Sequence, residues 1–294
     1  MRRYFISILL ANYNSLSLLK KAIESLKNQS YKNFELIVID NKSNDGSVEY
    51  LEKQSKRLKI KIVSEKDKGI SDAYSKGLRL VAGEIVGIFS VDERYYPNTL
   101  KKVNKWYNDF PKKIVCAGNC QFIDKKEKVI TTFKNKYINL KEHLRCDEII
   151  AINTCFFNRS ILKKELYYNN KFKTCMDYEL WARLLLKYKK THFKFFDTPI
   201  VQSKLTDDSM SFRSDSFNQM VSDKIGYLDF FLKNNKSKLL IKGIKKKECI
   251  AGINLWAAIQ LKYINGNIDQ SIKYLNRCYK NDPKSKVLKK FVKE

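Results

Sequence analysis

The sequence is short of several residue patterns, and each shortage argues against a class of protein. Its two histidines, His143 and His192, lie far apart, which argues against a histidine-centred metal site or catalytic triad. Its seven cysteines are an odd number without the close paired spacing of a zinc site, so we expect reduced, mostly buried thiols. No apolar run approaches the ~20 residues of a membrane-spanning helix. No G-x-G-x-x-G motif follows the first predicted strand, which disfavours a dinucleotide-dependent oxidoreductase.

Acidic residues are also few: 58 Lys and Arg stand against 31 Asp and Glu, a formal net charge of +27. Such a surface attracts phosphates, whether in nucleotides, nucleic acid or anionic lipid. A basic nucleic-acid-binding protein is one alternative, but the basic residues are spread along the chain and form no recognition motif. We therefore expect no specific nucleic-acid partner. We expect a cytoplasmic protein, with peripheral contact to anionic lipid at the inner face of the cell membrane as a further option.

The chain of 294 residues, 44% of them hydrophobic, is long enough to bury a large core. Its first part alternates strand-like and helix-like segments, which is typical of βαβ units. This pattern predicts an α/β fold with a mixed, mainly parallel sheet flanked by helices. Ligands of such sheets bind at the carboxyl ends of the strands. The strands that we expect cover residues 6–10, 34–39, 60–63, 84–91, 114–117, 120–123, 129–133 and 194–200.

The stretch from Glu84 to Pro97 is the most informative part of the first half. An apolar run rich in β-branched residues ends in two adjacent acids, Asp92 and Glu93. Adjacent carboxylates repel each other unless a positive charge lies beside them, so the pair indicates a divalent cation or a polar ligand. The alternative is that both acids only cap the helix that starts near Pro97.

Two more strand ends carry polar residues. Asp40 closes the second predicted strand, where it could bind a ribose hydroxyl or a base edge, or only stabilise its own loop. After the third strand, Gly69 allows a sharp bend, and Ser71 or Asp72 caps the helix that follows. The backbone amides at the start of that helix would face the mouth of the sheet.

The segment from Met176 to Leu184 reads as an amphipathic helix with Asp177 in its first turn. The helix dipole favours an ionised carboxylate there, and an ionised carboxylate is a suitable general base. A plain helix cap is the alternative for Asp177.

These pieces together resemble a known family. The segments 40–47, 67–77, 83–97 and 176–184, in this order, resemble the inverting family 2 glycosyltransferases, which have the A-type glycosyltransferase fold. The resemblance covers about the first two-thirds of the chain. It implies a hexosyl- or N-acetylhexosaminyl-transferase that moves a sugar from a nucleotide-diphosphate sugar, a UDP-sugar above all, to an acceptor hydroxyl. It further implies a glycan or lipid-linked acceptor and a role in bacterial surface polysaccharide synthesis, such as capsule or lipopolysaccharide.

The resemblance also assigns residues. Asp177 would be the catalytic base, and a divalent cation, Mn²⁺ or Mg²⁺, would be held by Asp92 and Glu93. Glu93 departs from the family, which more often has a second aspartate there, so a catalytically inactive nucleotide-binding relative is a further alternative. The donor would be bound by Ala11, Tyr13, Asp40, Asp67, Gly69, Asp72 and Asp92.

The pattern changes near residue 217. We predict a catalytic domain over 1–216 and a basic helical region over 217–294, which appends to the sheet domain. The resemblance implies that residues 205–216 form a flap over the donor. Arg213 could contact the diphosphate there or could equally be a solvated surface charge. Residues 253–283 resemble one helical hairpin of a tetratricopeptide-like repeat, which is too short for a solenoid.

Overall fold

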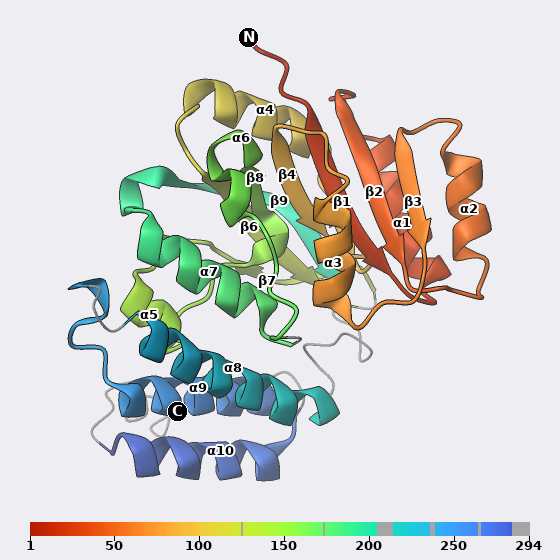
Figure 1. Ribbon diagram of the computed structural model, residues 1–294. Coiled ribbons are helices and arrows are strands. Elements are labelled where there is room, and N and C mark those ends of the chain that lie inside the picture. Colours follow the sequence, from red (N-terminus) through yellow and green to blue (C-terminus); the bar gives the residue numbers. More distant parts are fainter. Residues whose placement is uncertain (125, 173, 205–213, 236–238, 264–265, 284–294) are drawn as a thin grey trace. The chain divides into compact units, whose positions relative to one another are not determined.

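Figure 1 shows the computed structural model, which describes residues 1–294 apart from 125, 173, 205–213, 236–238, 264–265 and 284–294. The described chain forms two compact units. The first contains residues 1–137, 150–170 and 188–206, and the second contains 138–149, 171–187 and 207–294. Each unit is therefore built from three separate stretches of the chain.

Four parallel strands form one half of the sheet in the first unit, in the order β3-β2-β1-β4. Every residue of β2 and of β4 is buried, as expected for central parallel strands. The register pairs Asn12 with Asp40 and Leu10 with Phe89, so the carboxyl ends of these strands lie along one edge. The predicted strands are confirmed as β1 (Ile6–Asn12), β2 (Phe34–Asp40), β3 (Ile60–Ser64) and β4 (Ile85–Phe89).

Three helices connect these strands: α1 (Leu16–Lys27), α2 (Ser47–Gln54) and α3 (Ile70–Leu78). Helix α3 lies very close to β1, because a Cβ atom on Gly77 would come within 2.1 Å of the Leu9 side chain. Gly69, directly before α3, has φ of +117°, a conformation that L side chains rarely adopt. Glycines therefore set both the start of α3 and its distance from the sheet.

The other half of the sheet is mixed and continues from β4 in the order β8-β6-β9-β5, with β7 paired to β6. The sequence predicts two strands at 114–117 and 120–123, but the structure has one continuous strand. The reason is that β9 pairs in parallel with β6 on both sides of a register shift near Asn119. The strands are β5 (Glu93–Tyr95), β6 (Val115–Ile123), β7 (Val129–Phe133), β8 (Cys155–Asn158) and β9 (Phe193–Lys204).

Helical segments around this half are short apart from α4 (Thr99–Asp109), which buries Leu100, Val103 and Trp106 in the core of the sheet. The others are η1 (Ile152–Thr154), α6 (Arg159–Leu162), η2 (Lys163–Glu165) and η3 (Lys190–His192).

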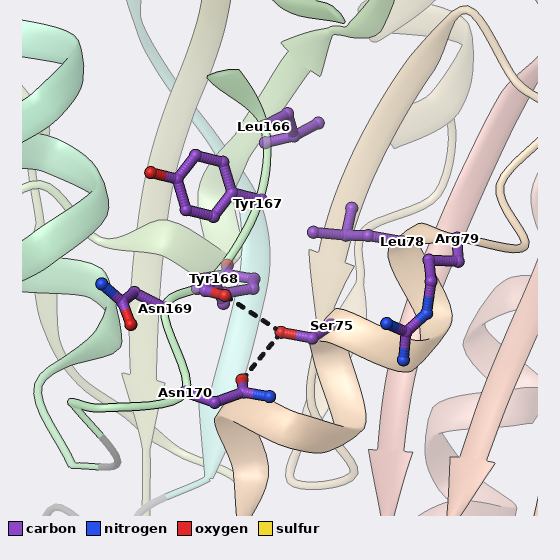
Figure 2. A pocket seen from close by; sticks show the side chains of 8 residues that line it. All are labelled: Ser75, Leu78, Arg79, Leu166, Tyr167, Tyr168, Asn169 and Asn170. Carbon is purple, nitrogen blue, oxygen red and sulfur yellow. Dashed lines mark hydrogen bonds between the residues drawn. The ribbon is translucent and has the colours of Figure 1, made fainter. Parts of the chain in front are cut away.

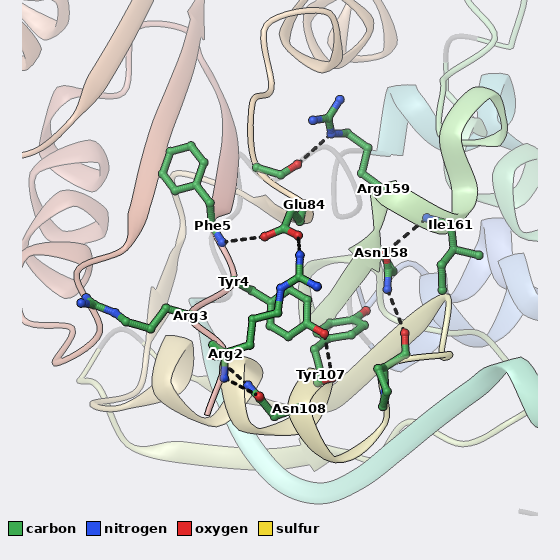
Figure 3. Close-up of polar contacts among 12 residues, drawn as sticks. Arg2, Arg3, Tyr4, Phe5, Glu84, Tyr107, Asn108, Asn158, Arg159 and Ile161 are labelled. Carbon is green, nitrogen blue, oxygen red and sulfur yellow. Dashed lines mark hydrogen bonds and ion pairs between the residues drawn. The ribbon is translucent and has the colours of Figure 1, made fainter.

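Figure 3 shows the opposite edge of the sheet, where β1 and β4 begin. The Glu84 carboxylate accepts a hydrogen bond from the Phe5 backbone amide at 3.4 Å and pairs with Arg2. Arg159 Nε donates to the Gly83 carbonyl at 2.7 Å. Polar side chains from outside the strands thus fix the start of the two central strands.

The second unit is helical. Its helices are α5 (Leu140–Leu144), α7 (Met176–Lys187), α8 (Ser214–Asn234), α9 (Lys246–Tyr263) and α10 (Ile268–Asn281), with the 3₁₀ turn η4 (Leu239–Ile241). The predicted hairpin is confirmed as α9 and α10, in which Asn267 caps α10 and Ser271 Oγ donates to the Ala258 carbonyl at 2.9 Å. Among the described helices, none has both the length and the hydropathy that crossing a bilayer demands.

The boundary predicted at residue 216 stays a prediction. Helices α5 and α7 precede that residue but belong to the helical unit. The flap over 205–216 and Arg213 fall almost entirely outside the described residues.

The thiols and one imidazole are held in unreactive states. All seven cysteines are free and buried, as predicted. Burial raises the pKa of Cys116, Cys120 and Cys175 to about 12, so these thiols stay protonated at neutral pH. Burial also lowers the pKa of His143 to about 3, and its Nε2 donates to the Tyr178 carbonyl at 2.8 Å. His143 is therefore a neutral packing residue.

Candidate active site

The carboxylate of Asp40 organises the mouth of the sheet. Asp40 is completely buried at the end of β2 and accepts hydrogen bonds from three neighbouring segments. Asn12 Nδ2 donates from the end of β1 at 2.7 Å, and Ser64 Oγ donates from the end of β3 at 2.8 Å. The Ser43 amide and hydroxyl donate from the following loop at 2.9 and 2.6 Å. These four bonds match the roughly four acceptor positions of a carboxylate, so Asp40 shapes the site by holding its loop in place.

Two residues predicted to contact a base lie beside this network. Ala11 is half-buried near the end of β1, and Tyr13 follows that strand with 59% of its surface exposed. An exposed aromatic ring at a strand end offers a flat face on which a nucleobase can stack.

The start of α3 lies along the same edge of the sheet, and the loop after β2 is bonded to it. The Asn41 side chain accepts from the Asp67 amide at 2.9 Å, and Asp67 accepts from the Gly69 amide at 2.8 Å. Asp72 accepts from the Lys68 amide at 3.1 Å and pairs with Lys76 at 3.3 Å. Burial opposes ionisation of Asp72, but these two contacts outweigh it and lower its pKa. The structure therefore brings Asp40, Asp67, Gly69 and Asp72 to one loop cluster.

The two adjacent acids after β4 have different environments. Glu93 is 5% exposed and points into the sheet, where its carboxylate accepts from the Ser90 amide at 2.9 Å and from Asn153 Nδ2 at 2.6 Å. Asp92 is half-buried, and its carbonyl accepts from the Lys204 amide at 2.9 Å, which ties the turn to β9. The pair therefore divides into an inward structural carboxylate and a more accessible one.

This arrangement bears on the predicted metal site. Within the residues that the structure describes, no three His, Cys, Asp or Glu side chains gather into a metal-binding group. A single aspartate is nevertheless a usual protein ligand for Mg²⁺ or Mn²⁺ when phosphate oxygens and water complete the shell. The geometry fits a site with Asp92 as the protein ligand better than a site with both acids.

Asp177 lies in the second unit, in the first turn of α7. Its Oδ1 atom is enclosed and has no hydrogen-bond partner within the described structure. Burial raises the pKa of Asp177 to about 6, and the charge of Lys224 opposes that rise. Its approach to the donor residues of the first unit remains a prediction.

Lys224 is the charged neighbour that acts on Asp177. This lysine of α8 is only 8% exposed, and its Nζ lies 4.5 Å from the ring centroids of both Tyr178 and Trp256. Aromatic faces stabilise an ammonium group that burial deprives of water. Lys224 thus has an aromatic environment in the same unit as Asp177.

A cavity of about 490 Å³ flanks α3 (Figure 2). The Ser75 hydroxyl on its wall lies 3.2 Å from the Tyr168 carbonyl and 3.0 Å from Asn170 Oδ1. Asn170 Nδ2 in turn donates to Asp72 at 3.2 Å. None of the predicted donor residues lines this cavity, but its wall helps to hold Asp72.

Sequence reasoning missed the residues that support the acids. Asn12, Ser43 and Ser64 surround Asp40. Asn12 and Ser64 end their strands and Ser43 lies three residues after Asp40, and these positions could have indicated that role. Asn153 was marked only by being a polar residue inside an apolar run, and Lys224 only by being a lysine between the apolar residues of a helix.

Comparison with known proteins places these features in a family. The family model described as "Glycosyl transferase family 2" matches residues 7–166. An uncharacterized glycosyltransferase of Methanocaldococcus jannaschii is 26% identical over 191 residues, which are 63% of this chain and 66% of the relative. The GalNAc(5)-diNAcBac-PP-undecaprenol beta-1,3-glucosyltransferase of Campylobacter jejuni is 26% identical over 194 residues, with coverage of 64% and 61%. The match to a Rickettsia conorii glycosyltransferase covers 36% of that protein, so the chain spans only part of several relatives.

Solved structures confirm the fold. TarS of S. aureus in complex with UDP-GlcNAc has a TM-score of 0.60 at 14% identity, covering 94% of this chain and 88% of that one. The mannosyltransferase PcManGT of Pyrobaculum calidifontis in complex with GDP-Man and Mn²⁺ has a TM-score of 0.60 at 15% identity, with coverage of 99% and 79%. The predicted A-type glycosyltransferase fold is therefore present.

The two adjacent acids should respond differently to loss of charge. Glu93→Gln replaces one acceptor oxygen with an NH₂ group. Either the Ser90 amide or Asn153 Nδ2 then loses its acceptor, so we expect the free energy of unfolding to fall by about 1–3 kcal/mol. Asp92→Asn should leave stability almost unchanged and weaken Mn²⁺-dependent binding of UDP or GDP. Urea unfolding and calorimetric titration measure the two effects; equal destabilisation by both substitutions would contradict this division.

Asp177 should make stability depend on pH. Its folded pKa of about 6 lies above the ordinary value of 3.8, so its contribution to stability is full below pH 3.8 and is lost as pH rises through about 6. The Asp177→Asn variant should not show this fall in the free energy of unfolding, which is on the order of 2–3 kcal/mol, and should therefore be more stable than the wild type at pH 7. The control is the exposed Asp197, whose pKa is lowered by its pairing with Lys134. Asp197→Asn should not change the slope of the free energy of unfolding against pH between pH 4 and 6.

Replacing Lys224 tests the neighbouring charge. Lys224→Met should raise the pKa of Asp177 further, so that the stability loss extends to higher pH. A double-mutant cycle with Asp177→Asn at pH 7 should give a coupling on the order of 1 kcal/mol. Lys233→Met, at an exposed position of the same helix, should show none. A coupling of zero for Lys224 would mean that its charge does not reach Asp177.

Proposed function

Because the chain belongs to glycosyl transferase family 2, we propose that it moves a sugar from a nucleotide-diphosphate sugar to an acceptor hydroxyl, with inversion at the anomeric carbon. The donor residues at the mouth of the sheet would bind the nucleotide. Asp177 would act on the acceptor.

The environment of Asp177 is the observation that carries this proposal. A general base must be ionised at working pH and must still bind a proton well enough to remove one. Burial raises the pKa of Asp177 to about 6, against the charge of Lys224, which brings the carboxylate close to that condition. Its enclosed Oδ1 makes no hydrogen bond within the described structure, so an acceptor hydroxyl can donate to it.

The reaction then needs one displacement. The acceptor oxygen forms a bond to the anomeric carbon while its proton passes to the Asp177 carboxylate. The bond from the anomeric carbon to the diphosphate breaks on the opposite face, and the nucleoside diphosphate leaves with the electron pair. One base and one leaving group on opposite faces of the sugar produce inversion.

The residues of the first unit would orient the donor. Tyr13 offers a ring for the base, and Asp67 and Asp72 rim the loop cluster that Asp40 holds. The start of α3, directly after Gly69, would direct the positive end of the helix dipole toward a phosphate. Asp92 would hold a divalent cation, Mn²⁺ or Mg²⁺, which when bound neutralises charge on the departing diphosphate.

Relatives support a class of substrate. TarS structures contain UDP or UDP-GlcNAc, and the PcManGT structure contains GDP-Man and Mn²⁺, which supports a nucleotide sugar as donor. We expect a UDP-sugar and hexosyl or N-acetylhexosaminyl transfer. The name of the Campylobacter jejuni relative includes an undecaprenol-linked acceptor, which supports a glycan or lipid-linked acceptor. We further propose a role in bacterial surface polysaccharide synthesis. Such a role would place the protein in the cytoplasm, in peripheral contact with the inner face of the membrane.

A donor panel tests the proposal. The protein is incubated with UDP-, GDP-, dTDP- and CDP-linked sugars and Mn²⁺ or Mg²⁺, and release of the nucleoside diphosphate is followed. We expect one donor class to turn over, and Asp177→Asn to lower the rate by about 10²–10⁴-fold, the usual contribution of a general base. On that donor, kcat/KM of the wild type should fall as pH drops below about 6.

The matched control is Asp197→Asn, which removes an exposed carboxylate and should keep full activity. Equal rates for wild type and Asp177→Asn would contradict the base assignment. Nucleotide binding without turnover of any donor would instead identify a catalytically inactive nucleotide-binding relative. Salt-dependent binding to nucleic acid, with no nucleotide preference, would favour a basic nucleic-acid-binding protein.

A further inference from the structure

The 3₁₀ turn η4 between α8 and α9 exposes two adjacent leucines. Leu239 is 80% exposed and Leu240 is 61% exposed. Single exposed apolar residues are common on protein surfaces, but neighbouring large ones are evidence of a contact surface. We call Leu239, Leu240 and the nearby described lysines Lys233, Lys242 and Lys247 the leucine turn.

The local backbone holds the leucines outward. The next residue, Ile241, is buried with 8% of its surface exposed and anchors the turn in the helical unit. The Lys242 amide donates to the Leu239 carbonyl at 3.0 Å, and Gly243 reverses the chain with φ of +86°. Because Ile241 takes the inward position, the two preceding leucines are left on the surface.

Exposed lysines precede and follow the two leucines along the chain. Three exposed lysines make no ion pair with any described residue: Lys233, Lys242 and Lys247. The nearby acids are already neutralised, since Asp229 pairs with Lys246 at 2.7 Å and Glu248 lies 3.4 Å from Lys245. The surface therefore combines uncompensated ammonium groups with exposed aliphatic side chains.

We propose that the leucine turn is a membrane-contact element, which places Leu239 and Leu240 at the acyl boundary of a bilayer while the lysines bind anionic headgroups. Binding to an anionic bilayer is favoured by both features, because aliphatic side chains leave water and ammonium groups contact lipid phosphates. Binding to nucleic acid would be favoured only by the lysines. The proposal rests on the proposed function only for the expectation of a lipid-linked acceptor.

Vesicle sedimentation with the full chain tests this without any sugar donor. The wild type should bind vesicles that contain phosphatidylglycerol and phosphatidylcholine, and bind phosphatidylcholine alone much more weakly. Leu239→Ser with Leu240→Ser should weaken binding by about tenfold or more, from the partial burial of two leucines. Lys242→Gln with Lys247→Gln should weaken binding about tenfold or more and reduce its salt dependence.

The matched control is Ile268→Ser with Ile272→Ser, which removes two isoleucines of α10 that are 53% and 49% exposed. It should bind vesicles like the wild type, and circular dichroism should show that all variants are folded. The proposal is overturned if the wild type does not bind phosphatidylglycerol vesicles. It is also overturned if the leucine variant binds them as tightly as the isoleucine control. Tight binding to single-stranded RNA that survives the leucine substitutions, without vesicle binding, also overturns it. Failure of the donor panel would leave vesicle binding unaffected, so the two proposals fail separately.

Discussion

The buried carboxylate of Asp40 is the constraint on which the mouth of the sheet depends. It joins the carboxyl ends of β1, β2 and β3 through Asn12, Ser43 and Ser64. Because Asp40 is completely buried, removing its carboxylate would leave buried donor groups without an acceptor, at a cost in desolvation free energy. The conformation of the loops at this edge of the sheet therefore depends on a buried side chain.

The same separation of tasks recurs at the other acids. Glu93 satisfies a buried amide and Asn153, while its neighbour Asp92 remains accessible. Asp72 is held by contacts that keep it ionised, whereas Asp177 is enclosed so that its pKa rises. Identical chemical groups thus acquire different properties from what surrounds them.

The sequence allowed much of this fold to be predicted. The apolar runs of β2 and β4 and the helical spacing of α1 and α4 determine their own structure, and the order of the acidic motifs indicates the family. The continuous strand β6 could not be predicted, because its pairing depends on β9, whose paired residues lie about 80 positions later in the chain. The bond between Asn153 and Glu93 and the position of Lys224 beside Tyr178 likewise join distant segments. Local patterns carry no information on such pairings, so the orientation of each acid needed the structure.

The interleaving of the two units has a consequence for synthesis. Helices α5 and α7 leave the ribosome well before α8 and α9, against which they pack in the helical unit. In a nascent chain that has already formed its four parallel strands, the apolar faces of α5 and α7 therefore stay exposed until α8 and α9 have been synthesised. Such an intermediate exposes aggregation-prone hydrophobic surface for seconds at ordinary translation rates. Chaperone demand during expression should consequently be governed by the last third of the chain.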